Sequence, residues 1–108
     1  MKLSEVCEAL SLTAVVGDTD KDFDGVYVGD LLSRVMSRVD AGNLWITIMP
    51  NTNVIAVASL TEAAAVLLAE GVTLLDDALD AARDNGITVL SSELPAYELC
   101  VRIAGLLS

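Results

Sequence analysis

Residues 44–107 read LWITIMPNTNVIAVASLTEAAAVLLAEGVTLLDDALDAARDNGITVLSSELPAYELCVRIAGLL, and this stretch decides the fold. Three short apolar runs alternate with three longer segments of helical composition. The runs are continuously apolar, which is typical of parallel strands whose two faces are both covered by helices. The pattern predicts βαβαβα, with strands at 44–49, 64–68 and 87–90 and helices at 53–60, 73–85 and 95–107.

Shorter elements precede this alternation of strands and helices. Apolar residues at helical spacing predict a helix over 4–10. Two β-prone runs, 13–16 and 26–28, flank an acidic loop, so we expect a hairpin-like pair of strands. Asp30 is a suitable N-cap for a helix over 31–39. At 108 residues the chain fits one domain, 1–108, of the α/β class with a mostly parallel sheet and helices on both faces.

Charge and composition exclude several functions. Sixteen acidic and six basic residues give a formal net charge of −10, which repels nucleic acid and anionic lipid. No stretch approaches the roughly 18 apolar residues of a membrane span. The absence of histidine excludes His-based triads and His-containing zinc sites. No glycine pattern matches a Walker A loop or a dinucleotide fingerprint, so no cofactor is expected.

The two cysteines point to a reducing compartment. Cys7 and Cys100 lie in apolar helical contexts, where a reduced thiol behaves as a small hydrophobic side chain. The N-terminal MKLSEVCEAL lacks the apolar core of a signal peptide. We therefore expect a cytoplasmic protein with buried, inert thiols.

Polar side chains gather where the predicted parallel strands end. Ligands of open α/β sheets bind at this carboxyl edge, next to helix N-termini. The alternative is that some of these polar residues, Asn53, Thr73 and Ser92, do no more than cap helices. The predicted ligand-binding residues are Thr47, Asn51, Asn53 and Ser91.

The acidic loop contains the spacing D-x-D-x-D-G of a calcium-binding loop, at Asp20, Asp22, Asp24 and Gly25. The twelfth loop position, where a bidentate Glu is needed, falls on Leu31. The alternative interpretation is a solvated acidic loop without a metal.

The last predicted helix is apolar around most of its circumference. A helix of this kind is typically buried on two sides, so its second side could meet another subunit. The alternative is a frayed terminus that exposes a few leucines. The sequence thus favours a homodimer, whose predicted interface residues are Tyr97, Val101 and Leu106.

Five blocks carry a resemblance to the DRTGG domain family: GVYVGDLLS (25–33), LWIT (44–47), NVIAVA (53–58), ITVLS (87–91) and AYEL (96–99). The chain resembles this family in the order and spacing of the blocks. The resemblance implies similarity to the N-terminal domain of HPr kinase/phosphorylase, a regulator of bacterial carbohydrate use, whose kinase domain is separate. It also implies similarity to the accessory domains of phosphotransacetylases and CBS-domain pyrophosphatases.

These observations together predict a non-catalytic regulatory domain that senses a small molecule. The alternative is a structural module that pairs subunits or docks on a partner enzyme. Enzymatic activity is not expected, since Asp30 and Glu93 lack any neighbouring base, nucleophile or metal constellation in the sequence.

Overall fold

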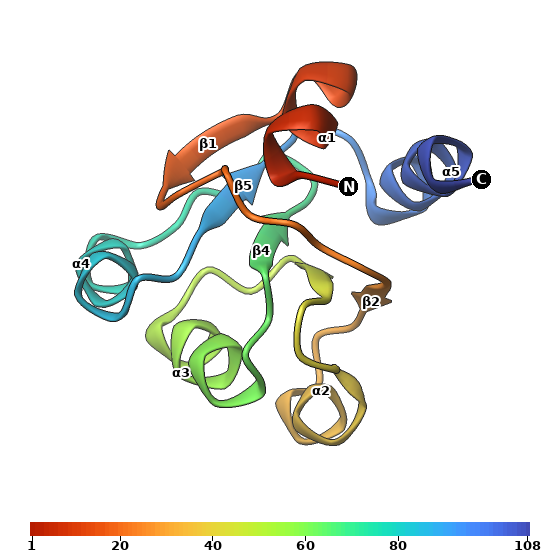
Figure 1. Ribbon diagram of the computed structural model, residues 1–108. Helices are drawn as coiled ribbons and strands as arrows, with labels where there is room; N and C mark the ends of the chain where they lie inside the picture. The colour runs from red at the N-terminus through yellow and green to blue at the C-terminus, as the bar shows by residue number, and fades with distance from the viewer.

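One five-stranded sheet with helices on both faces makes up the computed structural model, which describes residues 1–108 (Figure 1). None of the helices has the length and the apolar run that a membrane span requires. The strands are β1 (Thr13–Val16), β2 (Val26–Val28), β3 (Leu44–Thr47), β4 (Ala65–Leu68) and β5 (Val89–Ser91). The helices are α1 (Leu3–Leu10), α2 (Leu32–Arg38), α3 (Thr52–Thr61), α4 (Asp76–Asn85) and α5 (Ala96–Leu107).

The strand order confirms the predicted α/β class. The sheet runs β1-β5-β4-β3-β2, and the four strands β2 to β5 pair in parallel. Strand β1 alone is antiparallel, against β5. Each parallel step is made through a helix, as the alternating pattern of the sequence predicts.

The predicted hairpin-like pair is wrong, because β1 and β2 lie at opposite edges of the sheet. The segment between them runs past α1 and across the sheet (Figure 1). It is held there by backbone bonds: the N–H of Leu3 donates to the carbonyl of Lys21 (2.8 Å), and that of Phe23 to the carbonyl of Met1 (2.8 Å). The Phe23 side chain is buried in the core that α1 and α5 cover, which holds this segment against the sheet.

Two apolar layers confirm the prediction that helices cover both faces. On one face, α2, α3 and α4 pack against a core that includes Trp45 and Val66. On the other face, α1 and α5 pack against a core that includes Leu44 and Leu67. Successive strand residues thus enter different cores, which is why the strands read as unbroken apolar runs.

Three predicted helix starts shift in the structure. Helix α3 is capped by Asn51 in place of Asn53, since the Asn51 side chain accepts a hydrogen bond from the N–H of Val54 (3.3 Å). Helix α4 begins at Asp76, after Leu75, and not at Thr73. Leu31 occupies the N-cap of α2, because the Asp30 carboxylate is engaged by the end of β3.

The central strand should dominate stability. Leu67 is fully buried in β4, so Leu67→Ala should lower the free energy of unfolding by about 2–5 kcal/mol. The matched control, Leu60→Ala, changes an α3 leucine that is 72% exposed and should cost less than about 0.5 kcal/mol. Urea denaturation measures both. Equal losses for the two variants would contradict this account of the core.

Candidate ligand-binding site

The carboxyl ends of the parallel strands bring polar residues into one row. Thr47 pairs with Leu68, Leu68 pairs with Ser91, and Ser91 pairs with Thr13 of β1. Directly paired residues share a face of the sheet. Since Leu68 belongs to the core beneath α3 and α4, the whole row points toward those helices. Thr47 and Ser91 are two strands apart, or roughly 10 Å.

The Thr47 side chain is hydrogen-bonded within the protein. Its side chain is buried, and its hydroxyl donates to Oδ1 of Asp30 (2.6 Å) while accepting from the N–H of Met49 (3.3 Å). The same Asp30 oxygen accepts from the N–H of Ile48 (3.0 Å). This arrangement ties the loop after β2 to the end of β3. It also occupies the only hydroxyl proton that Thr47 could offer to a ligand.

The two asparagines lie beside Thr47 on the chain and do not join Ser91. Asn51 is used as the N-cap of α3, and Asn53 is exposed in the first turn of that helix. Neither lines the cavity that contains Ser91. The four predicted residues are thus divided between the end of β3 and a separate depression near β5.

That depression, hereafter the hydroxyl depression, has a volume of about 380 Å³. It lies between β1, β5, the loop that follows β4, and the start of α4. Four of its hydroxyls, from Ser11, Thr13, Thr73 and Ser91, make no hydrogen bond to another protein group, and the first three belong to exposed residues whose hydroxyls reach solvent. The fifth, from Ser92, accepts from the N–H of Leu94 (3.0 Å), so Ser92 stabilises a turn and does not cap α5. The lining residues are Ser11, Thr13, Val15, Gly71, Val72, Thr73, Leu74, Asp76, Leu79, Ser91, Ser92 and Glu93.

The charge of the hydroxyl depression is negative. Asp76 and Glu93 line it, and no lysine or arginine does. The Glu93 carboxylate lies directly against Gly71, where the β-carbon of any other residue would collide with the Glu93 Oε2 atom. Gly71 also has φ +72°, a conformation that favours glycine. The Glu93 side chain is exposed and flexible, so its carboxylate rests on Gly71 without being fixed there.

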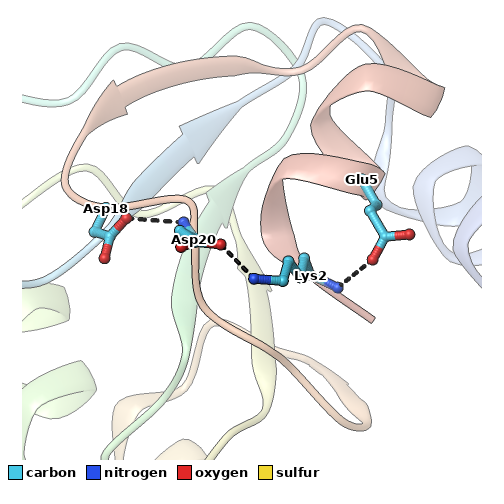
Figure 2. A network of polar contacts seen from close by, with 4 residues as sticks. All are labelled: Lys2, Glu5, Asp18 and Asp20. Carbon is cyan, nitrogen blue, oxygen red and sulfur yellow. Dashed lines mark hydrogen bonds and ion pairs between the residues drawn. The ribbon is translucent and has the colours of Figure 1, made fainter.

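The acidic loop is used for structure, not arranged as a calcium site. Figure 2 shows Asp20 paired with Lys2 and its N–H donating to Oδ1 of Asp18 (2.8 Å), while Glu5 accepts from the N–H of Lys2 (2.9 Å). The hydrogen bond between Lys2 and Asp20 lowers the pKa of the Asp20 carboxyl and raises the pKa of the Lys2 amine. Asp20, Asp22 and Asp24 do not converge, and no group of three acidic, Cys or His side chains could hold a metal ion.

Both thiols are free and partly buried. Burial raises the pKa of Cys7 and of Cys100 above the ordinary thiol value. A raised pKa keeps each thiol protonated at neutral pH, and a protonated thiol is a poor nucleophile. The cysteines therefore add packing and no evident chemistry.

Removing the Thr47 hydroxyl tests the bond between the two strand ends. Thr47→Val keeps the shape, removes one of the two hydrogen bonds to Asp30 and leaves the Met49 N–H without its partner, and should lower the free energy of unfolding by about 1–3 kcal/mol. Asn53→Ala, an exposed change on the neighbouring helix, should stay within about 0.5 kcal/mol. Chemical denaturation compares them. A neutral Thr47→Val would show that this contact does not stabilise the fold.

No protein-family model and no curated protein matches the chain. Among solved structures, it is similar to the CBS and DRTGG domains of the regulatory region of Clostridium perfringens pyrophosphatase, solved with the activator diadenosine tetraphosphate. The TM-score is 0.75 at 16% sequence identity, and the match covers 94% of this chain and 45% of that one. This chain thus spans less than half of that regulatory region. The likeness shows the fold, which is that of a DRTGG-like domain, as the sequence resemblance implies.

Proposed function

We propose that this chain is a non-catalytic DRTGG-like regulatory domain, spanning 1–108, that senses a small molecule in the hydroxyl depression. The observation that carries the proposal is the set of four unpartnered hydroxyls around a cavity of about 380 Å³ at the carboxyl edge of a parallel sheet. That volume falls in the range of small-molecule sites, which reaches from about 300 to 1,000 Å³. The edge is where ligands of open α/β sheets bind.

The similar pyrophosphatase region supports a regulatory role. That protein binds a nucleotide activator through a region that contains CBS and DRTGG domains. A regulatory role is therefore within the repertoire of this fold. The tetraphosphate is a poor fit for the hydroxyl depression, since Asp76 and Glu93 would repel it and no basic residue lines the cavity.

The side chains around the depression support sensing over catalysis. Its hydroxyls have no histidine or lysine neighbour that could activate them as nucleophiles, and Asp30 is engaged by Thr47. Half-buried reduced thiols suit a reducing compartment, so we place the domain in the cytoplasm.

Filling the depression tests this function. A metabolite panel should contain compounds that raise the melting temperature of the wild-type protein, because a ligand at about 100 times its Kd adds roughly 2.7 kcal/mol to stability. Thr13→Tyr places a ring in the depression from an exposed strand position and should abolish the shift. Differential scanning fluorimetry measures it.

The matched control is Ala14→Tyr. Ala14 is the next residue of β1, is also exposed, and pairs with Leu90, whose side chain belongs to the opposite core. Ala14→Tyr should respond to the same compounds as the wild type. The proposal fails if no compound stabilises the wild type, or if Thr13→Tyr responds as the wild type does.

A second candidate function, subunit pairing as a homodimer, is favoured by an apolar groove beside β2. The groove has a volume of about 330 Å³ and is lined only by Val26, Val28, Cys100, Ala104 and Leu107. Strand β2 is an edge strand. Gly25 and Gly29 direct their backbone groups to β3, which leaves those of Val26 and Val28 pointing outward. A second copy could pair with this edge and fill the groove.

The exposed residues of α5 refine the predicted interface. Tyr97 and Val101 are 78% and 51% exposed and lie on the groove side of the helix, next to Ala104. Leu106 is about 140° away from Val101 around the helix axis, on the other flank of the buried stripe. The proposed contact therefore uses Tyr97 and Val101 with the β2 edge, and leaves Leu106 at or beyond the rim.

Light scattering tests the pairing. The wild type should have the mass of two chains, and Val101→Asp should be monomeric because an unpaired charge buried in the interface costs several kcal/mol, against about 8 kcal/mol for a micromolar dimer. Leu60→Asp adds the same charge to an exposed site on α3, across the sheet, and should remain dimeric. A monomeric wild type at high concentration would overturn the pairing.

A further inference from the structure

The hydroxyl depression also selects the chemistry of its ligand. Resting on the proposed sensing function, we propose that it takes an uncharged ligand that carries a vicinal diol, such as the ribose of a nucleoside or a free sugar. The donors, acceptors and charges that line the cavity favour this class over the alternatives.

The charges of the lining residues disfavour anions. Both titratable side chains, Asp76 and Glu93, are acids, and neither forms an ion pair in the structure. The rest of the chain adds to this field, since its net charge is −10. A phosphate or carboxylate in the cavity would face these charges without a counter-ion. An uncharged ligand avoids that repulsion.

The hydrogen-bonding groups favour a ligand rich in O–H donors. Ionised carboxylates only accept hydrogen bonds, whereas each hydroxyl can donate one and accept two. The cavity therefore offers more acceptors than donors. Two adjacent ligand hydroxyls suit the two oxygens of one carboxylate, and an acidic residue accepts a hydrogen bond from a ribose hydroxyl in dinucleotide-binding proteins.

Glu93 is the acid best placed for this contact. Its side chain is exposed, its carboxylate lies on Gly71, and no ion pair of the protein engages either oxygen. Asp76 is different, because it occupies the first turn of α4 and interacts favourably with the helix dipole. Glu93 thus has its full accepting capacity free.

Apolar side chains line the depression together with the hydroxyls. They belong to Val15, Val72, Leu74 and Leu79. A furanose or pyranose ring has hydroxyls at its edge and C–H groups on its faces, and so does the ribose of a nucleoside. Such a ring can use both the hydroxyls and the apolar side chains of this cavity, whereas a small polar ion can use only the hydroxyls.

Titration calorimetry on the full chain tests the inference, with adenosine, 2′-deoxyadenosine, D-ribose and ATP as probes. Adenosine or D-ribose should bind, and binding of adenosine without D-ribose would identify a nucleoside site, whereas binding of D-ribose would identify a sugar site. 2′-Deoxyadenosine lacks the diol and should bind at least tenfold more weakly than adenosine. ATP should also bind more weakly than adenosine.

The variant Glu93→Gln separates direct contact from the general field. It should weaken binding of the diol probe about tenfold, since it removes a charged acceptor. Glu70→Gln makes the same charge change at a nearby residue that does not line the cavity, and should bind as the wild type does. Circular dichroism checks that both variants fold.

Several results would overturn the inference. They are equal binding of adenosine and its deoxy analogue, ATP binding as tightly as adenosine, equal effects of the two glutamate variants, and no binding of any probe. A charged metabolite that stabilises the wild type and Ala14→Tyr but not Thr13→Tyr would overturn the diol and leave the sensing function standing. If no probe binds and no metabolite stabilises the wild type, the sensing function is overturned too.

Discussion

The complete burial of β4 is the constraint on which the rest of the structure depends. All four residues of Ala65–Leu68 are fully buried, because the strand lies at the centre of the sheet with helices over both faces. Val66 and Leu68 enter the core under α3 and α4, while Ala65 and Leu67 enter the core under α1 and α5. Both helical layers are needed, since removing either would expose half of the strand to water.

This constraint explains which parts of the fold could be predicted. Continuous apolar runs identify β3, β4 and β5, and the segments between them must be helices that return the chain to the same edge. The N-terminal half lacks such a regular alternation of strands and helices. Two short β-prone runs around an acidic loop suit a hairpin as well as two distant strands, and the choice depends on Phe23 and on backbone bonds to the start of α1. Phe23 lies within the loop and indicates that the loop packs on the protein, but it does not indicate which elements the loop meets.

The sequence predicts where the candidate site lies but not which residues line it. The rule that ligands bind at the carboxyl edge of a parallel sheet led to Ser91, which lines the hydroxyl depression. It also led to Thr47, whose hydroxyl is bonded to an aspartate from another strand end. Thr13 was missed because it lies on the antiparallel strand and meets Ser91 through a pairing between distant parts of the sequence. Gly71, in the loop after β4, contacts the Glu93 carboxylate, but a glycine in the sequence does not indicate which side chain lies against it.

The two proposed roles do not compete for the same surface. The hydroxyl depression is built on β1 and β5 at one edge of the sheet, and the apolar groove is built on β2 and α5 at the other. A dimer that used the groove would leave the depression open to solvent. The two sites would still share β4 and β3, the strands that lie between them and are buried on both faces. Since packed cores resist continuous deformation, a ligand at one edge could influence pairing at the other only through a shift of whole strands or helices. Ligand sensing and subunit pairing are compatible because their sites lie at opposite edges of the sheet. Coupling between the two sites requires a concerted shift of the rigid strands between them.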